Sequence, residues 1–151
     1  VGNGGMTRNE YITHYSMRAM LAAPLMLGND IRAMDKETLE ILSNREVIAV
    51  NQDEKGEQGR RFMDMGDYEI WAKPLNHGEI AVCFLNRSAQ PWILNYDWKR
   101  QTIFFATDVD MHRNEYVIRD LWQHREIGTT GSPTNATVVP HGVLMVRLSK
   151  K

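Results

Sequence analysis

The segment YEIWAKPLNHGEIAVCFLN, residues 68–86, carries the clearest structural signal in this chain. Tyr68, Ile70 and Ala72 alternate with residues of the opposite face, which gives the period of two that is typical of a β-strand. The triplet Asn-His-Gly at 76–78 is a turn signal, and the apolar run 80–85 has the length of a buried strand. This segment therefore predicts an antiparallel hairpin.

Further short strands are expected along the rest of the chain, separated by polar or glycine-containing turns. Their expected ranges are 91–98, 102–106, 116–122, 136–139 and 143–148. The last two flank the turn Pro140-His141-Gly142, so we expect them to pair as a terminal hairpin. Short strands with turns at regular spacing indicate an antiparallel sandwich or barrel.

The first third of the chain has a different pattern. A glycine-rich turn at 1–5 precedes Thr7, which with Glu10 forms a capping-box signal for a helix running to about residue 22. The apolar run 24–27 has strand length without alternation, as expected of a parallel strand buried on both faces. Asp35 is the N-cap candidate of a further helix. Two helices and one strand cannot close a sheet, so this layer needs partners.

The polar stretch 51–61 separates the two patterns and is interpreted as a boundary loop near residue 60. The order helix, strand, helix before it is that of an α/β protein, and the alternating strands after it are those of an all-β domain. The expected fold class is therefore α/β, then all-β.

Composition excludes several classes of protein. Hydrophobic residues make up 42% of the 151, enough for a sizeable core. The net charge of −1 gives no electrostatic basis for nucleic acid or an anionic membrane as a partner. The longest apolar run, around residues 20–27, is interrupted by Pro24 and is too short to cross a bilayer, and no secretion signal is visible.

Metal and cofactor motifs are not found in the sequence. The five histidines show no metal-ligand spacing, and there is no nucleotide-binding or nucleophile-elbow motif. Cys83 is the only cysteine, which excludes an internal disulfide, and its apolar surroundings favour a buried core residue. Two segments, Asn86-Arg87-Ser88 and Asn135-Ala136-Thr137, fit the glycosylation sequon, which mildly favours an exported protein.

Asp30 is the best-placed carboxylate, because it follows the expected strand 24–27 at the end where α/β barrels place active-site groups. The alternative is that Asn29 or Asp30 only caps or braces the loop. Hydrolysis of a sugar with retention needs two carboxyls about 5 Å apart, and no second carboxylate has a comparable position. The four tryptophans, at 71, 92, 98 and 122, would form either a sugar-stacking platform or packing.

Several segments resemble the α-galactosidases (melibiases) of glycoside hydrolase family 27. They lie in order along nearly the whole chain: VGNGGMT at 1–7, AAPLMLGNDIR at 22–32, ILSNREVIAVNQD at 41–53, QGRR at 58–61, EIWAKPL at 69–75, FLNRS at 84–88, RDLW at 119–122 and VPHGV at 139–143. The departures are Glu54-Lys55-Gly56 in place of the usual Pro-Leu-Gly, and an unusual loop at 99–114.

The resemblance implies that residues 1–60 are the C-terminal fragment of a (β/α)₈ barrel (helix 7, strand 8, helix 8) and that residues 61–151 are an antiparallel β-sandwich. It implies retaining hydrolysis of terminal α-galactosyl residues by two aspartates, without metal or organic cofactor. Neither aspartate matches a position of this chain, so we expect no catalytic residue here. Gly28, Asn29 and Asp30 match a motif at the barrel rim, near the substrate.

The resemblance further implies two partners: α-galactoside sugars bound by the complete barrel, and the N-terminal barrel segment itself. It implies a secreted, periplasmic or lysosome-like location, and residues 1–151 alone are expected to be inactive. The alternative function is a non-catalytic galactoside-binding or structural β-sandwich module.

Overall fold

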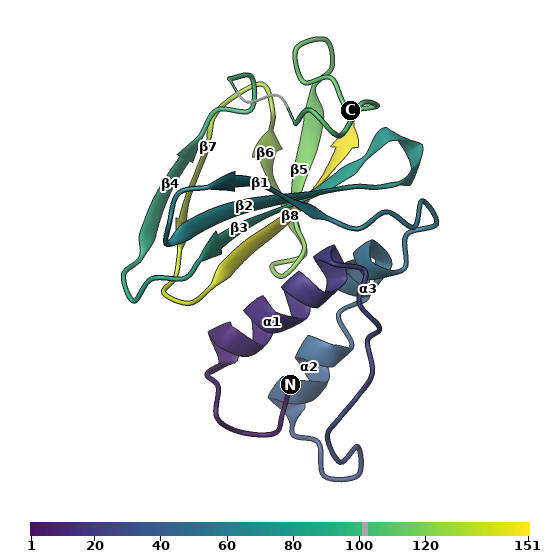
Figure 1. Cartoon of the computed structure of the whole chain (residues 1–151), viewed down its shortest axis with the longest axis vertical. Coiled ribbons are helices and arrows are strands. Elements are labelled where there is room, and N and C mark those ends of the chain that lie inside the picture. Colours follow the sequence, from purple (N-terminus) through teal and green to yellow (C-terminus); the bar gives the residue numbers. More distant parts are fainter. Residues whose placement is uncertain (101–102) are drawn as a thin grey trace.

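The computed structural model describes residues 1–100 and 103–151, and it stacks three layers (Figure 1). Three helices form the first layer: α1 Arg8–Met20, α2 Lys36–Leu42 and α3 Arg45–Asn51. A six-stranded sheet is the middle layer and a two-stranded sheet the third. The strands are β1 Arg60–Asp64, β2 Tyr68–Pro74, β3 Ile80–Asn86, β4 Trp92–Tyr96, β5 Tyr116–Asp120, β6 Arg125–Thr129, β7 Thr134–Val138 and β8 Val143–Lys150.

Every strand pair of both sheets is antiparallel. The large sheet has the order β1-β2-β3-β8-β5-β6, and β4 pairs with β7 in the small one. The hairpin expected over residues 68–86 is present, with Trp71 opposite Cys83 and a turn at Asn76–Gly78. The alternation of the sequence thus places one face of each strand of the large sheet toward the small sheet.

The middle sheet is buried on both faces, and β3 shows how. Its even-numbered residues Ile80, Val82 and Phe84 enter the core between the two sheets. Its odd-numbered residues Ala81 and Cys83 enter a second core beneath the helices. Cys83 is a free, fully buried thiol as predicted, and burial raises its pKa, so it is no reactive thiolate.

The helix starts follow their sequence signals. Thr7 and Glu10 form a complete capping box at α1. The Asp35 side chain accepts the backbone N–H of Thr38 at α2. Asn44 begins α3 in the same way, and its Nδ2 also donates to the Leu121 carbonyl at 3.0 Å, which ties this helix to the end of β5.

Three expectations about strands are wrong, and two strands were not expected. Residues 24–27 form no strand in this structure, because no parallel strand within residues 1–100 and 103–151 offers them backbone partners. Residues 103–106 form no strand either, and residue 102 of that expected strand lies outside the described residues. The expected hairpin of the last two strands is absent, since β7 pairs with β4 while β8 lies between β3 and β5. Strands β1 and β6 lie in segments too polar to show alternation.

Lys73 joins the helices to the sheet. Only 1% of this residue is exposed, and its ammonium group lies among the last carbonyls of two helices. Nζ donates to the Ala19 oxygen of α1 at 3.2 Å and to the Val50 oxygen of α3 at 2.5 Å. A cation is favourable there because helix C-termini carry unpaired carbonyls and partial negative charge. Burial lowers the pKa of Lys73, partly opposed by the charge of Asp53.

Gly59 makes a second contact between the helices and the sheet, at the point where the chain leaves the helical layer for β1. Its backbone N–H donates to the Met20 carbonyl at 2.7 Å. A Cβ on this glycine would lie 2.7 Å from the same oxygen, so no larger residue fits without moving the helix end. The two layers are therefore joined by direct contacts at the point where the sequence pattern changes.

Replacing Lys73 should weaken the packing of α1 and α3 on the large sheet. We expect Lys73→Met to lower the free energy of unfolding by about 2–3 kcal/mol, since the buried Val50 carbonyl loses its donor and the Ala19 carbonyl keeps only backbone N–H donors, while the apolar stem is retained. Urea unfolding of residues 1–151 measures the change. Lys99→Met, at an exposed lysine, is the matched control and should change stability by less than about 0.5 kcal/mol. Equal stability of the two variants would contradict the structural role of Lys73.

Candidate functional site

The loop Gly28–Arg32 follows the extended segment that leaves α1, and Asp30 is its central acid. Asp30 Oδ1 accepts from the backbone N–H of Arg32 at 3.0 Å, and its Oδ2 accepts from the Arg32 guanidinium at 2.9 Å. The side-chain bond from Arg32, and then the backbone bond, lower the pKa of Asp30. An acid held ionised in this way cannot serve as a proton donor near neutral pH.

Asn29 and Gly28 lie against the glycine turn at the start of the chain. Asn3 Nδ2 donates to the Gly28 carbonyl at 3.2 Å. Gly2 has φ +80°, and a Cβ there would lie 2.7 Å from the Thr38 side chain, so the close packing requires glycine. Asn29 Oδ1 is buried, and the described part of the chain provides no hydrogen-bond donor to it. Such an atom is left for a donor from elsewhere.

A small cavity of about 200 Å³ lies beside this loop, between α1 and residues 25–29. His14, Tyr15 and Arg18 line its helical side. Burial lowers the pKa of His14, and the charge of Arg18 lowers it further, which favours the neutral imidazole. No aspartate or glutamate lines the cavity. The loop therefore supplies polar contacts but not the facing carboxyl pair that sugar hydrolysis requires.

Apolar side chains next to the loop lie open to solvent. Met26 is 84% exposed, Leu27 53% and Ile31 67%. Three exposed apolar side chains within six residues are typical of a surface that packs against something else. The predicted rim residues Gly28, Asn29 and Asp30 thus stand together, at the edge of an uncovered apolar face.

The four tryptophans pack against other side chains of the protein. Trp98 is buried in the core between the sheets, and its Nε1 donates to Thr134 Oγ1 at 2.8 Å. Trp122 packs edge-on against Tyr15 and donates to Ser16 Oγ, while Trp71 faces the helices. Trp92 stacks on Tyr68 with ring centroids 4.8 Å apart. These contacts favour the packing interpretation over a sugar platform.

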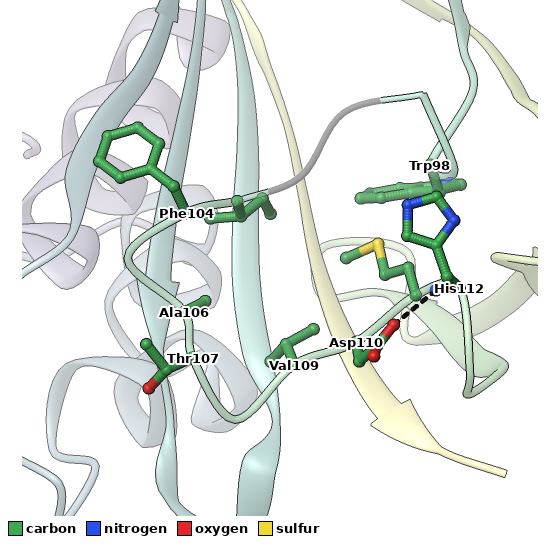
Figure 2. Close-up of a pocket in the computed structure, with 9 residues that line it drawn as sticks. Trp98, Phe104, Ala106, Thr107, Val109, Asp110 and His112 are labelled. Carbon is green, nitrogen blue, oxygen red and sulfur yellow. Dashed lines mark hydrogen bonds between the residues drawn. The ribbon is translucent and has the colours of Figure 1, made fainter.

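A second cavity, of about 270 Å³, lies in the loop between β4 and β5 (Figure 2). Trp98, Phe104 and His112 line it, and the Asp110 carboxylate accepts the His112 backbone N–H at 2.9 Å. The backbone N–H groups of Arg113 and His112 lower the pKa of Asp110, so this acid shapes a turn. Only residues of the sandwich line this cavity, and none belongs to the rim.

Glu46 at the start of α3 is an ionic link to the sandwich that the sequence analysis missed. Arg119 on β5 binds it in bidentate fashion, with Nε 2.7 Å from Oε2 and Nη2 2.8 Å from Oε1. His124 Nδ1 lies 2.8 Å from Oε1. The only local signal was Asn44, whose N-cap chemistry places Glu46 in a first helical turn. Its partners are more than 70 residues away.

No group of three or more His, Cys, Asp or Glu residues that could hold a metal ion occurs in residues 1–100 and 103–151. In the same residues no helix has the length and apolar character needed to cross a membrane.

Two family models match the chain in succession. The model of the alpha galactosidase C-terminal beta sandwich domain matches residues 65–148, more than half of the chain, and that of alpha galactosidase A matches residues 1–53. The chain belongs to the α-galactosidases of glycoside hydrolase family 27. The fold class expected from the sequence, a sandwich that follows a barrel fragment, is confirmed by this membership.

Known α-galactosidases extend the match along the whole chain. Alpha-galactosidase 2 of Arabidopsis thaliana is 40% identical over 152 aligned residues, covering 100% of this chain and 36% of the relative. The alpha-galactosidase of Cyamopsis tetragonoloba is also 40% identical, with 100% and 35% covered. The crystal structure of alpha-galactosidase I from Mortierella vinacea superposes with a TM-score of 0.88 at 34% identity, covering 98% of this chain and 37% of that one. The chain thus spans little more than a third of the length of these α-galactosidases.

The ion pair between Glu46 and Arg119 makes the stability of this α-galactosidase segment depend on pH. The bonds from Arg119, and then from His124, lower the pKa of Glu46. The native state therefore binds fewer protons, so this stability is present above the unfolded pKa of about 4.3 and is lost as the pH falls through the lower folded pKa.

We expect Glu46→Gln in a His124→Gln background, which leaves only Arg119 as the partner, to cost about 1 kcal/mol at pH 7 and almost nothing at pH 2.5. Urea unfolding at the two pH values measures this. Glu40→Gln, at a solvent-exposed i,i+4 pair, is the control and should cost less at pH 7. A Glu46→Gln cost that is the same at both pH values would refute the pH dependence.

Proposed function

We propose that residues 1–151 act as the C-terminal part of a retaining α-galactosidase that hydrolyses terminal α-galactosyl residues. The observation that carries the proposal is the match of the full chain to little more than a third of α-galactosidase length, with the model of the C-terminal sandwich domain following that of alpha galactosidase A. The reacting aspartates would be contributed by a barrel segment outside residues 1–151. The chain by itself is then inactive.

We further propose that residues 1–60 complete the barrel and residues 61–151 form the sandwich. The family models support a boundary between 53 and 65, and the change of layer at Gly59 lies within this interval. The uncovered side chains of Met26, Leu27 and Ile31 would pack against the preceding barrel segment. In this assembly residues 24–27 gain the parallel neighbours that a strand requires.

In that assembly Gly28, Asn29 and Asp30 would lie near the substrate. The unpaired Asn29 Oδ1 supports a polar contact there, either with a sugar hydroxyl or with a neighbouring barrel residue. Asp30 would stay an ionised partner of Arg32 and would hold the loop rather than transfer a proton. The proposal implies a secreted, periplasmic or lysosome-like location.

The activity test compares the chain alone with a completed protein. Residues 1–151 should not release p-nitrophenol from p-nitrophenyl α-galactoside. A chimera that carries the preceding part of Arabidopsis thaliana alpha-galactosidase 2 before Val1 should release it, and should not act on the β-galactoside. Turnover by residues 1–151 alone, or an inactive but folded chimera, would refute the proposal.

The role of the rim can be tested in the same chimera. Asn29→Ala should lower kcat/KM roughly two- to tenfold, the worth of one hydrogen bond, with unchanged thermal unfolding. The exposed Asn95→Ala in β4 is the matched control and should leave kcat/KM unchanged. If the two variants have the same kcat/KM, Asn29 does not contact the substrate.

A further inference from the structure

The structure gives the two glycosylation sequons of this chain opposite environments. We propose that Asn135 is an acceptor for an N-linked glycan when the chain enters a secretory lumen, and that Asn86 carries none in the folded protein. The inference concerns the sandwich and does not depend on the proposed activity.

Asn86 is closed to modification because its amide is part of the core. The residue is fully buried at the end of β3. Its Nδ2 donates to the carbonyls of Gln90, Val138 and Val139 at 2.8, 3.0 and 3.1 Å. Its Oδ1 accepts from the backbone and side chain of Ser88, both at 2.9 Å. A sugar on this nitrogen would remove the link between β3 and the end of β7.

Asn135 is the second residue of β7 and lies on the outer face of the small sheet. Its neighbours Thr134 and Val138 point into the core, while Asn135 and Thr137 are exposed. Asn135 Oδ1 accepts from Asn95 Nδ2 at 2.5 Å on the paired strand. The acceptor nitrogen and the hydroxyl of the sequon therefore face the same side, toward solvent.

The surroundings of Asn135 suit a glycan. A groove of about 510 Å³ beside it is lined by polar residues, among them Gln123, Arg125 and Glu126, which can hydrogen-bond to sugar hydroxyls. On its other flank Ile93, 74% exposed, lies opposite Thr137 in the strand register. A glycan on Asn135 would cover this apolar side chain.

The small sheet also lies away from the surface that the proposed barrel would use. The helices pack on the face of the large sheet opposite to β4 and β7, as the two separate cores show (Figure 1). The segment between α1 and α2, which carries the exposed Met26, Leu27 and Ile31, lies on the helical side (Figure 1). A glycan at Asn135 is thus compatible with completion of the barrel.

Transfer of a glycan to Asn135 needs one co-reactant, a polyisoprenyl-diphosphate-linked oligosaccharide. The bond between sugar C1 and the diphosphate oxygen breaks as the Asn135 Nδ2–C1 bond forms. The amide gives up one proton to a base of the transferase, and the polyisoprenyl diphosphate leaves with the electron pair of the broken bond. No oxidation or reduction is involved.

The test expresses residues 1–151 behind a cleavable export signal in a eukaryotic host and isolates the folded, trypsin-resistant fraction. Peptide-N-glycosidase converts each glycosylated asparagine to aspartate, which peptide mass spectrometry locates. We expect aspartate at 135 and asparagine at 86. Thr137→Ala should abolish the glycan, whereas Ser88→Ala, the matched loss of the other sequon, should leave it in place. An unmodified Asn135, or a glycan on Asn86 in this fraction, would overturn the proposal.

A second measurement keeps the inference testable if the exported chain folds poorly. In the unglycosylated protein made in bacteria, Asn135→Gln should leave the urea midpoint unchanged, while Asn86→Gln should lower it clearly. If Asn135→Gln lowers the midpoint as much as Asn86→Gln, Asn135 is a structural residue and the proposal fails.

Discussion

The buried ammonium group of Lys73 is the contact on which the arrangement of the layers depends. It comes from the second strand of the large sheet and supplies a donor to the ends of both α1 and α3. Helix C-termini leave carbonyls with few backbone donors, and the Ala19 and Val50 carbonyls that Lys73 binds are buried. Together with the close approach of Gly59 to Met20, this cation fixes where the helices sit on the sheet.

The large sheet therefore has two buried faces and belongs to both parts of the chain. Cys83, Leu121 and Met145 pack under the helices, while Phe84 and Tyr116 pack against the small sheet. The ionic contacts of Glu46 and the bond from Asn44 to Leu121 tie the far end of the same interface. The change of sequence pattern near residue 60 is a change of secondary structure within a continuous packed unit, and the open surface lies on the other side of the helices.

The rim residues Gly28, Asn29 and Asp30 lie beside that open surface. Asp30 is paired with Arg32, while Asn29 has a buried oxygen that receives no donor from the part of the chain that the structure describes, next to exposed apolar groups. The proposed barrel segment would cover such a surface, and this chain spans little more than a third of the length of its α-galactosidase relatives. Burial also separates the two sequons. The buried Asn86 amide makes hydrogen bonds within the core, whereas the exposed Asn135 amide is accessible for modification at the surface.

Features that depend on neighbours within a few residues could be predicted from the sequence. Helix caps at Thr7 and Asp35, the alternation in β2 and the buried run of β3 were all readable, and the ordered motifs identified the family. Only the tertiary structure decided what depends on distant partners. It separated β7 from β8, left residues 24–27 without a sheet, and brought Lys73 and Glu46 to their partners. The physical reason is that periodicity and capping act over one or two turns, whereas strand pairing and buried charge need groups brought together by the folded chain.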